Sequence, residues 1–452
     1  MRLRKTITTI VATAILLAGW QLFAVIANQP ELIPSLPRLV RTLCEWLVSG
    51  SFYQSVGATI LRGVLGMSIS FVCAIGMAGL FARFEWVYEL FRPLLAIMRS
   101  IPVISFILLA LIFLNPESIP LMIAFLTMFP LLTENLTRGI LDLRPGLSIM
   151  ARQFHIKRSN VLFQIIYPQL KPFLYSGLAS AAGFGWRAII MGEVLSQCAF
   201  GIGSEMKRAQ NFISVPELLA WTIVAVFISF FFDKGISKVA DITPKISFAN
   251  EDQTIPTPTL SVLDTKDISY QYGIQHFSHS FQKGIIYGIS APSGKGKTTL
   301  LNLIGGILLP TEGEIHPTRH FGIATIFQQP QLLPHLTAEE NIILPLSSFL
   351  TEEKARRIAQ KHLQEMEMES FGNRYPKELS YGQQQRIAIA RALAYPSPLL
   401  LMDEPFKGLD EALSHRIIER IREKQMKEER IILFTSHNPD EIRLLADEVI
   451  YL

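Results

Sequence analysis

Apolar residues are concentrated in the first half of the chain, in long runs separated by short polar connections. The runs occupy about residues 7–26, 56–81, 94–114, 119–136, 173–194 and 218–232. Because roughly 20 consecutive apolar residues cross a bilayer as a helix, this pattern predicts six membrane-spanning helices. The basic start of the chain could belong to a signal peptide, but no small-residue cleavage site follows, so we expect a retained first helix.

The second half has shorter apolar runs. Segments 284–290, 399–405 and 431–437 are each typical of a strand that is buried on both faces of a parallel sheet. Helical patterns lie between them, which predicts an α/β fold with an inserted helical segment around 335–395. The polar, proline-bearing stretch 246–258 predicts a flexible tether. We therefore expect a membrane domain at 1–245 and a soluble domain at 259–452.

Composition and charge support this division. The chain is 49% hydrophobic and 18% charged, which is too apolar for a soluble protein of this length. Up to Lys245 there are 21 basic and 12 acidic residues, and after it 21 and 26, so the acidic second half argues against nucleic acid as a partner. Cys44, Cys73 and Cys198 have no C-x-x-C spacing, which favours buried thiols over disulfides or a zinc site.

Basic residues in the connections predict the orientation in the membrane. With the N-terminus inside, fourteen Lys and Arg residues fall in inner segments and four in outer ones. Positive charge accumulates on the cytoplasmic side, so both ends of the chain are expected there.

Four charged residues fall within or beside the predicted spans. Arg62, Arg99 and Glu193 lie near span ends, where we expect their side chains to snorkel toward the interface. Arg187 is harder to explain in this way. Its neighbours Gly183 and Gly185 indicate a tightly packed helix that lines an interior, so Arg187 is a candidate pathway residue.

The candidate chemistry begins after segment 284–290, where a glycine-rich loop leads into a helix. The loop fits G-x-x-x-x-G-K-[ST] except that Ala291 stands at the first glycine; the alternative is a chance glycine-rich turn. In such a loop backbone N–H groups bind phosphate, the lysine reaches the β- and γ-phosphates, and the next hydroxyl binds Mg²⁺. The candidate ATP-binding residues here are Ala291, Pro292, Ser293, Gly294, Lys295, Gly296, Lys297, Thr298 and Thr299.

Two carboxylates follow the apolar run of 399–405. Asp403 would hold Mg²⁺ through water, and Glu404 would polarise the water that attacks the γ-phosphate. The alternative is a surface acidic pair at a strand end. The metal ligands predicted from these residues are Thr298 and Asp403, and the family resemblance described next implies Gln328 as a third.

From about Leu260 to the end, the chain resembles ABC ATPases. Leu379-Ser380-Tyr381-Gly382-Gln383 resembles the signature L-S-G-G-Q, with Tyr381 in place of the first glycine. The resemblance implies that Ser380, Tyr381, Gly382 and Gln383 contact the nucleotide of a second subunit, and that Asp410 lies in a loop at the dimer interface. It also implies catalytic roles for Gln328 and His437 beside Glu404, and an adenine-stacking role for Tyr272, with Tyr270 as the alternative.

The segment from Glu31 to about Ile236 resembles permease subunits of bacterial binding-protein-dependent ABC importers, in particular the nitrate, sulfonate, taurine and thiamine-pyrimidine branch. The resemblance rests on Leu32–Pro37, Arg99–Pro102 and the inner loop 137–172. In that family the loop carries an E-A-A-x-x-x-G motif that docks on the ATPase. Ala151, Arg152 and His155 belong to this coupling helix here, although Ile149, Met150 and His155 replace its Glu, first Ala and Gly. The expected groove is formed by residues 332–341.

Together these features predict an all-α transmembrane domain of the type I importer class, followed by an α/β P-loop ATPase with an inserted helical subdomain. The expected function is ATP-driven import across the bacterial inner membrane, with ATP and Mg²⁺ as cofactors and the ATPase in the cytoplasm. Because Ser380 would complete a site on another copy, a homodimer is expected. Its other partners would be membrane lipid and an extracytoplasmic solute-binding protein that delivers a small solute.

Two other functions fit part of the pattern. A membrane domain ahead of an ATPase is common in exporters, and a chain that binds ATP without pumping could be a channel or sensor. The single long inner loop favours import over export, and Glu404 argues against a chain that cannot hydrolyse ATP. The solute is expected to be a nitrate- or sulfonate-type anion, or a thiamine or riboflavin precursor.

Overall fold

The computed structural model describes residues 2–240, 244–253, 260–271, 273–292, 294–317 and 322–452. The chain forms two compact units. Unit 1 contains Met1–Leu143 and Gln169–Thr243, and unit 2 contains Arg144–Pro168 and Pro244–Leu452. The polar loop 144–168 therefore folds with the second half of the chain, although it lies between two apolar helices in sequence.

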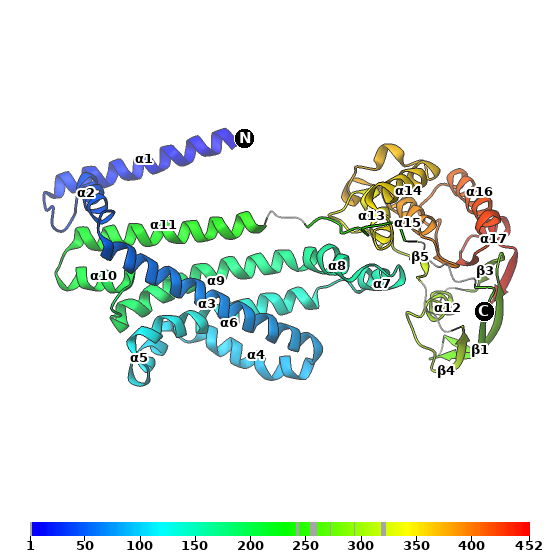
Figure 1. The fold of residues 1–452 in the computed structure, drawn as a ribbon, viewed down its shortest axis with the longest axis horizontal. Coiled ribbons are helices and arrows are strands. Elements are labelled where there is room, and N and C mark those ends of the chain that lie inside the picture. The colour runs from blue at the N-terminus through cyan, green and yellow to red at the C-terminus, as the bar shows by residue number, and fades with distance from the viewer. Residues whose placement is uncertain (1, 241–243, 254–259, 272, 293, 318–321) are drawn as a thin grey trace. The chain divides into compact units, whose positions relative to one another are not determined.

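All regular secondary structure in the described residues of unit 1 is helical (Figure 1). In the part of the chain that the structure describes, four helical stretches are long and apolar enough to cross a membrane: Gly50–Arg83, Pro116–Leu141, Arg158–Ser196, whose first residues belong to unit 2, and Val215–Ile236. A shorter apolar helix covers Val11–Ala27. The elements are α1 (Arg2–Ala27), α2 (Leu36–Trp46), α3 (Gly50–Arg83), α4 (Glu85–Ser100), α5 (Val103–Phe113), η1 (Pro116–Ser118), α6 (Ile119–Leu141), α9 (Tyr167–Ser196), α10 (Ile202–Asn211) and α11 (Val215–Ala240).

The predicted span 94–114 is wrong as a single helix. α4 and α5 meet at Ile101-Pro102 with a bend of 94°. Proline lacks an N–H, and it pushes the preceding residue out of the helical region. Ile101 accordingly has φ −72° and ψ 129°, so the chain turns where a continuous helix was expected.

Small residues bring the helices of unit 1 close together. A Cβ at Gly66 of α3 would lie 2.6 Å from the Cβ of Ala124 on α6, and one at Gly185 of α9 would lie 2.0 Å from Cε of Met128 on α6. Such close approach is typical of membrane helices, where van der Waals contact replaces hydrophobic burial as the main attraction. α3, α6 and α9 therefore form the packed centre of this unit.

Unit 2 is built on a five-stranded parallel sheet with the order β5-β6-β7-β3-β8. An antiparallel sheet with the order β2-β1-β4 accompanies it, and Figure 1 shows α13, α14 and α15 gathered together. The strands are β1 (Val262–Tyr270), β2 (Ile274–Gln282), β3 (Ile286–Ser290), β4 (Glu312–His316), β5 (Ala324–Ile326), β6 (Leu399–Asp403), β7 (Ile431–Thr435) and β8 (Glu448–Tyr451). The helices are α7 (Pro145–Gln153), α8 (Arg158–Asn160), the π-helix η2 (Val161–Ile166), α12 (Lys297–Ile304), α13 (Ala338–Leu346), α14 (Glu352–Glu365), η3 (Glu369–Phe371), η4 (Pro376–Glu378), α15 (Tyr381–Ala394), α16 (Glu411–Glu428) and α17 (Pro439–Leu445).

The parallel sheet explains why distant motifs meet. β6 and β7 are buried along their whole length, as their continuous apolar sequences predicted. Parallel strands present their carboxyl ends at one edge, which is where ligands bind in such sheets. The segments that follow β3, β5, β6 and β7 therefore bring the candidate chemistry to the same edge.

Candidate functional site

The loop between β3 and α12 has the backbone that a phosphate-binding loop needs. Gly294 and Gly296 have φ values of 81° and 90°, in the left-handed region that favours glycine. A Cβ at Gly296 would lie 2.7 Å from the carbonyl oxygen of Gly273, so a larger residue would not fit. Ala291 is not among the residues with positive φ, so the alanine at the first glycine position causes no backbone strain. Ser293 lies outside the described residues.

Lys297 and Thr298 begin α12 and face different partners. The Nζ of Lys297 donates to the carbonyl oxygen of Ala291 at 2.7 Å, so the ammonium lies against the loop itself. The Thr298 hydroxyl donates to Oδ2 of Asp403 at 2.9 Å, and the Thr435 hydroxyl donates to Oδ1 of the same carboxylate at 2.8 Å. The segment after β3 and the end of β6 are therefore in direct contact, through Thr298 at the start of α12 and Asp403.

The Thr298–Asp403 pair fits a magnesium ion in its chemistry. A hydroxyl and a carboxylate are hard oxygen ligands, and Mg²⁺ in nucleotide sites usually takes one or two such groups together with phosphate and water. Asp403 is buried. Among the described residues it accepts hydrogen bonds from two hydroxyls and forms no ion pair. Its negative charge is therefore left for a cation.

Glu404 is held by three side chains from three different loops. Its carboxylate lies 3.2 Å from Nζ of Lys407, 3.1 Å from Nε2 of His437 and 3.3 Å from Nε2 of Gln328. Burial alone would raise the pKa of Glu404, but the hydrogen bond and charge of Lys407, with smaller contributions from Gln328 and His437, lower it below its ordinary value. The three predicted catalytic residues are therefore in direct contact, and Lys407 is a partner that the sequence did not reveal.

Backbone strain accompanies this contact. Glu404 has φ 48°, which is uncommon for a residue with a side chain, and its N–H donates to the Thr435 hydroxyl at 3.1 Å. Strained backbone of this kind is concentrated at functional sites, where the surrounding structure maintains it.

Ser380 caps α15 in a complete capping box. Its hydroxyl accepts from the Gln383 N–H at 3.3 Å, and its own N–H donates to Oε1 of Gln383 at 2.9 Å. The phenol of Tyr381 donates to the carbonyl oxygen of Gln328 at 2.8 Å. The hydrogen bonds that the structure gives Ser380 are thus with its own helix, whereas Tyr381 connects this helix to the loop after β5.

The remaining nucleotide candidates have simpler surroundings. Asp410 caps α16 by accepting from the Leu413 N–H at 2.9 Å. Tyr270 packs partly buried against the core beneath the antiparallel sheet, which is the ordinary role of a strand aromatic. Tyr272 lies outside the described residues, although the neighbouring Gly273 touches the phosphate-loop segment at Gly296.

The loop 144–168 is seated inside unit 2. α7 belongs to the same buried apolar cluster as Leu332, Leu333, Leu336 and Ala338, which lie in the groove predicted at 332–341. The side-chain amide of Gln153 donates to the Gly305 carbonyl at 2.8 Å. The backbone carbonyl of Gln153 accepts from the Ile323 N–H at 2.8 Å. Ala151 is buried and Arg152 is exposed. His155 has φ 47°, so it adopts the left-handed turn for which a glycine is suited.

Arg391 is a buried residue that the motif search missed. It donates to the carbonyl oxygens of Pro330 and Gln331 at 2.9 and 2.8 Å, and its guanidinium lies 5.5 Å from the ring centroid of Phe154, which follows α7. Burial lowers the pKa of Arg391 to about 10, so it stays charged at neutral pH. An arginine inside a helical pattern carries no sequence signal that distinguishes such a contact from a solvated position.

A cavity of about 260 Å³ is lined both by residues of the candidate nucleotide site and by residues of α7. Its lining includes Thr298, Gln328 and Asp403 on one side and Gly146 and Ile149 of α7 on the other. The residues suited to nucleotide and metal therefore border the same space as the docked helix.

In unit 1 the structure corrects the expectation for Arg62 and Glu193. They do not snorkel, because the Glu193 side chain is fully buried and its carboxylate lies 2.7 Å from Nη1 of Arg62. The same carboxylate accepts from the Thr59 hydroxyl at 2.9 Å and from the Gly203 N–H at 2.9 Å. Arg62 also pairs with Glu117 at 2.6 Å. Arg99 is also ion-paired, with Glu134, but its side chain is 41% exposed, so its expected snorkelling stays a prediction.

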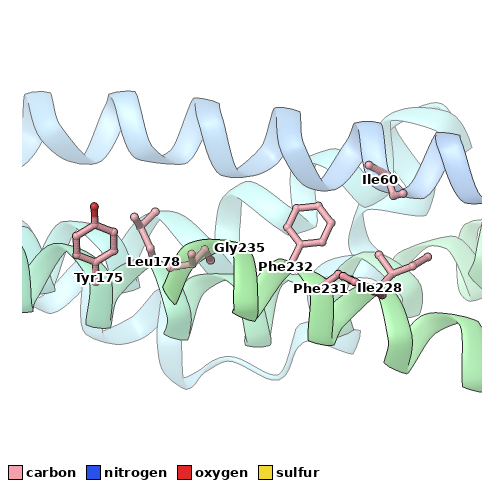
Figure 2. A pocket seen from close by; sticks show the side chains of 8 residues that line it. Ile60, Tyr175, Leu178, Ile228, Phe231, Phe232 and Gly235 are labelled. Atoms are coloured by element: carbon pink, nitrogen blue, oxygen red, sulfur yellow. The ribbon is translucent and has the colours of Figure 1, made fainter. Parts of the chain in front are cut away.

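Unit 1 also contains an apolar cavity of about 670 Å³ between α3, α9 and α11 (Figure 2). Figure 2 shows Phe232 projecting from α11 toward α3, which carries Ile60. The eight lining residues carry no charged side chain. This cavity therefore suits an acyl chain or another apolar group and offers no partner for a charged solute.

Comparison with known proteins matches each half separately. Residues 274–407 match the family described as ABC transporter, and residues 68–233 match the family described as binding-protein-dependent transport system inner membrane component. The Fe(3+) ions import ATP-binding protein FbpC of Rhizobium etli is 35% identical over 189 residues, covering 40% of this chain and 54% of that protein. The thiamine import ATP-binding protein ThiQ of Yersinia pseudotuberculosis is 35% identical over 205 residues, covering 42% and 86%.

A solved structure, the dimeric post-hydrolysis state of the ATP-binding cassette MJ0796 bound to ADP and Pi, aligns with 42% of this chain and 94% of that chain, at 32% identity and a TM-score of 0.40. The chain spans about half the length of several of the curated relatives that it matches. The apolar helices and the inner-membrane-component match make it a membrane protein, and the predicted fold class is confirmed. The chain belongs to the ABC transporters and joins a permease domain of the binding-protein-dependent type to an ABC ATPase domain in one polypeptide.

Proposed function

We propose that this chain imports a small solute across the bacterial inner membrane and uses ATP hydrolysis to do so, with residues 1–245 as the permease, 246–258 as the linker and 259–452 as the ATPase. The observation that carries the proposal is that the loop 144–168, between two apolar helices, belongs to the same compact unit as Thr298, Asp403 and Glu404. Movement caused by nucleotide would reach the helices on either side of this loop. Among the described residues, one such loop from the permease half belongs to unit 2, which favours import over export.

The nucleotide would bind at the carboxyl edge of the parallel sheet. The loop 291–299 would hold its phosphates through backbone N–H groups and Lys297, with the adenine against Tyr272. Thr298 and Asp403 would hold Mg²⁺, with Gln328 as a further ligand, and the ion would neutralise charge on the phosphates. Glu404 orients and deprotonates the attacking water, and His437 and Gln328 hold its carboxylate in place.

The site requires two copies of the chain. Ser380 lies at a capped helix N-terminus, which suits an anion, but its hydrogen bonds stay within its own helix. In a C2 homodimer each phosphate loop would face Ser380, Tyr381, Gly382 and Gln383 of the other copy, with Asp410 near the contact. Closing the two nucleotide sites would displace α7 and change the access of the permease.

The positions of the basic residues favour a cytoplasmic ATPase with both termini inside. An extracytoplasmic solute-binding protein would deliver the solute to the outer face, as the inner-membrane-component match implies. The matched relatives include proteins for import of Fe(3+) ions, thiamine and glucose, so the ATPase half does not select the solute. The proposed solute is a sulfonate- or nitrate-type anion, or a thiamine or riboflavin precursor.

The proposal is tested with the full chain in lipid vesicles. Glu404→Gln should lower ATP hydrolysis by at least about a hundredfold while ATP still binds, because it removes the base that activates water. Glu411→Gln, an exposed carboxylate at the start of α16, is the matched control and should change the rate by less than about twofold. A Glu404→Gln chain that still accumulates solute from its binding protein would overturn the pumping mechanism.

A further inference from the structure

α9 carries an arginine at membrane depth for which the structure shows no partner. Arg187 is exposed, and among the described residues it has no hydrogen bond or ion pair, in contrast to Arg62 and Arg99. It lies three to four residues from the centre of the predicted span 173–194, which is about 5 Å along a helix. On a translocon scale an arginine at the centre of a span costs about 2.5–3.5 kcal/mol, so an arginine near the centre is stabilised by water or by a partner.

Snorkelling does not solve this problem. Side chains on a helix point toward its N-terminus, and the N-terminus of α9 is the end joined to the inner loop. Arg187 lies on the outer side of the span centre, so its side chain leans toward the centre and away from the nearer headgroups. Lipid alone therefore cannot accommodate the guanidinium.

The face of α9 around Arg187 is open along its length. Phe184 and Met191, at helical spacing from Arg187, are 60% and 42% exposed. A Cβ at Gly183 would meet nothing within 4 Å. The opposite face is packed, because Gly185 and Gly192 lie against α6 with no room for a side chain. α9 thus has one face buried in its own unit and one face, centred on an arginine, that must be covered by something else.

The exposed face of α11 is different. Its large exposed residues, Val226, Phe227, Phe230 and Phe231, are all apolar, as a lipid-facing surface should be. The arginine face of α9 is therefore not a second lipid-facing surface. Its natural cover is the same face of a second copy, across a water-filled path.

We propose that Arg187 of each copy lines the solute path between the two permease domains and that the pair forms a binding site for a small anion of the sulfonate or nitrate class. Two guanidinium groups that face one path repel each other, and an anion between them removes the repulsion. Transporters commonly bind substrate near the midplane, where Arg187 lies. This inference rests on the proposed import function and chooses the anion over the thiamine or riboflavin precursor as its solute.

The test uses a cysteine next to Arg187 and needs no knowledge of the solute. Met191→Cys is placed in a full-length chain in which Cys44, Cys73 and Cys198 are serine, in lipid vesicles without nucleotide. The probes are a negatively charged sulfonatoethyl and a positively charged trimethylammonioethyl methanethiosulfonate, with each rate divided by that of the reagent with free cysteine. With Arg187 present the anionic probe should react at least about tenfold faster, because two cations lie within a turn of the thiol.

Arg187→Gln in the same background should abolish this preference while the thiol stays reactive. Phe227→Cys on α11 is the matched control and should react slowly with both probes, since water-soluble reagents do not reach lipid-facing thiols. Equal rates at Met191→Cys and Phe227→Cys, or reaction without charge preference, would overturn the proposal. Selective labelling in a chain that fails the ATP-hydrolysis test would instead overturn the import function and leave the anion path standing.

Discussion

Replacing Glu193 by glutamine should open the end of unit 1 where α9 contacts α3 and α10. The carboxylate joins three elements, because it accepts from Thr59 and Arg62 on α3 and from the Gly203 N–H at the start of α10, while Glu193 itself belongs to α9. Glutamine has the same shape, but it carries no charge and turns one oxygen into a donor. That donor would face groups that are themselves donors.

The expected loss of stability depends on which partners Arg62 keeps in the variant. Removing one partner from a buried ion pair typically costs about 3–5 kcal/mol, because the other charge is left in a low dielectric. Arg62 keeps Glu117 at 2.6 Å and the Phe200 carbonyl at 2.7 Å, so the lower limit applies here. A loss of about 3 kcal/mol corresponds to roughly a hundredfold increase in the population of open states.

Cys198 reports this opening directly. Its thiol is 4% exposed and donates to the Pro116 carbonyl at 3.2 Å, beside the Glu117–Arg62 pair. With Cys44 and Cys73 replaced by serine, the alkylation rate of the folded chain in detergent measures how often this region opens. Glu193→Gln should raise that rate by about a hundredfold.

The matched control is Glu205→Gln. Glu205 is a carboxylate of α10, and its ion pair with Arg208 at 3.0 Å spans three residues of one helix and is partly exposed. It also accepts from the Ser55 hydroxyl of α3 at 3.3 Å, a hydrogen bond that the remaining oxygen of glutamine can still accept. Such a pair contributes at most about 1 kcal/mol, so alkylation should rise less than about fivefold. Both variants also remove one negative charge from unit 1, so an effect of net charge on alkylation would affect both. Equal rates for the two variants would refute the reasoning.

Three further substitutions test contacts in unit 2. Arg391→Lys should lower the free energy of unfolding by about 2 kcal/mol more than Arg386→Lys in a denaturant titration. Both arginines donate to two backbone carbonyls, but Arg391 is fully buried, so a carbonyl that lysine leaves unpaired there cannot be solvated, whereas Arg386 is only partly buried. His155→Val should cost about 1–2 kcal/mol because a β-branched residue tolerates φ 47° poorly, whereas His155→Gly should change stability by less than about 1 kcal/mol in the same calorimetric scan. Lys407→Ser should raise kcat for ATP by no more than about fivefold, because losing the half-exposed Lys407 ammonium raises the pKa of Glu404 and makes it a stronger base; a fall in kcat would contradict this.

Much of the ATPase fold could be predicted because its signals are local. Continuous apolar strands predicted the parallel sheet, and the order of motifs then predicted which loops meet at its edge. Asp403 and Thr298 are 105 residues apart in sequence yet lie in hydrogen-bonding contact, as this topology requires. The same reasoning could not find Lys407 or Arg391, because long basic side chains are mostly solvated and their sequence context gives no sign of a particular carboxylate or carbonyl partner.

The membrane half was predicted less completely. Apolar length identifies a span but not a bend within it, and the turn at Ile101-Pro102 follows only from proline stereochemistry. Arg62 and Glu193 lie on helices that are distant in sequence, and the hydropathy pattern treats each one as an isolated charge at a span end. Their pairing depends on how α3 packs against α9, which the pattern of apolar residues does not encode.

The glycine that is missing from the signature shows how a departure from a family pattern can be offset elsewhere in the chain. Tyr381 occupies the position of that glycine, and its ring lies against Gly408, where a Cβ would come within 2.7 Å of the tyrosine Cδ1. Gly408 also has φ 80°, so only glycine suits both its backbone and its neighbour. The bulky residue on α15 is therefore accommodated by a small one in the loop after β6, and the tyrosine gains a hydrogen bond to the Gln328 carbonyl. This exchange ties the signature helix to the loop that carries Gln328, so we infer that Tyr381 restricts how far the two can move apart during the ATP cycle.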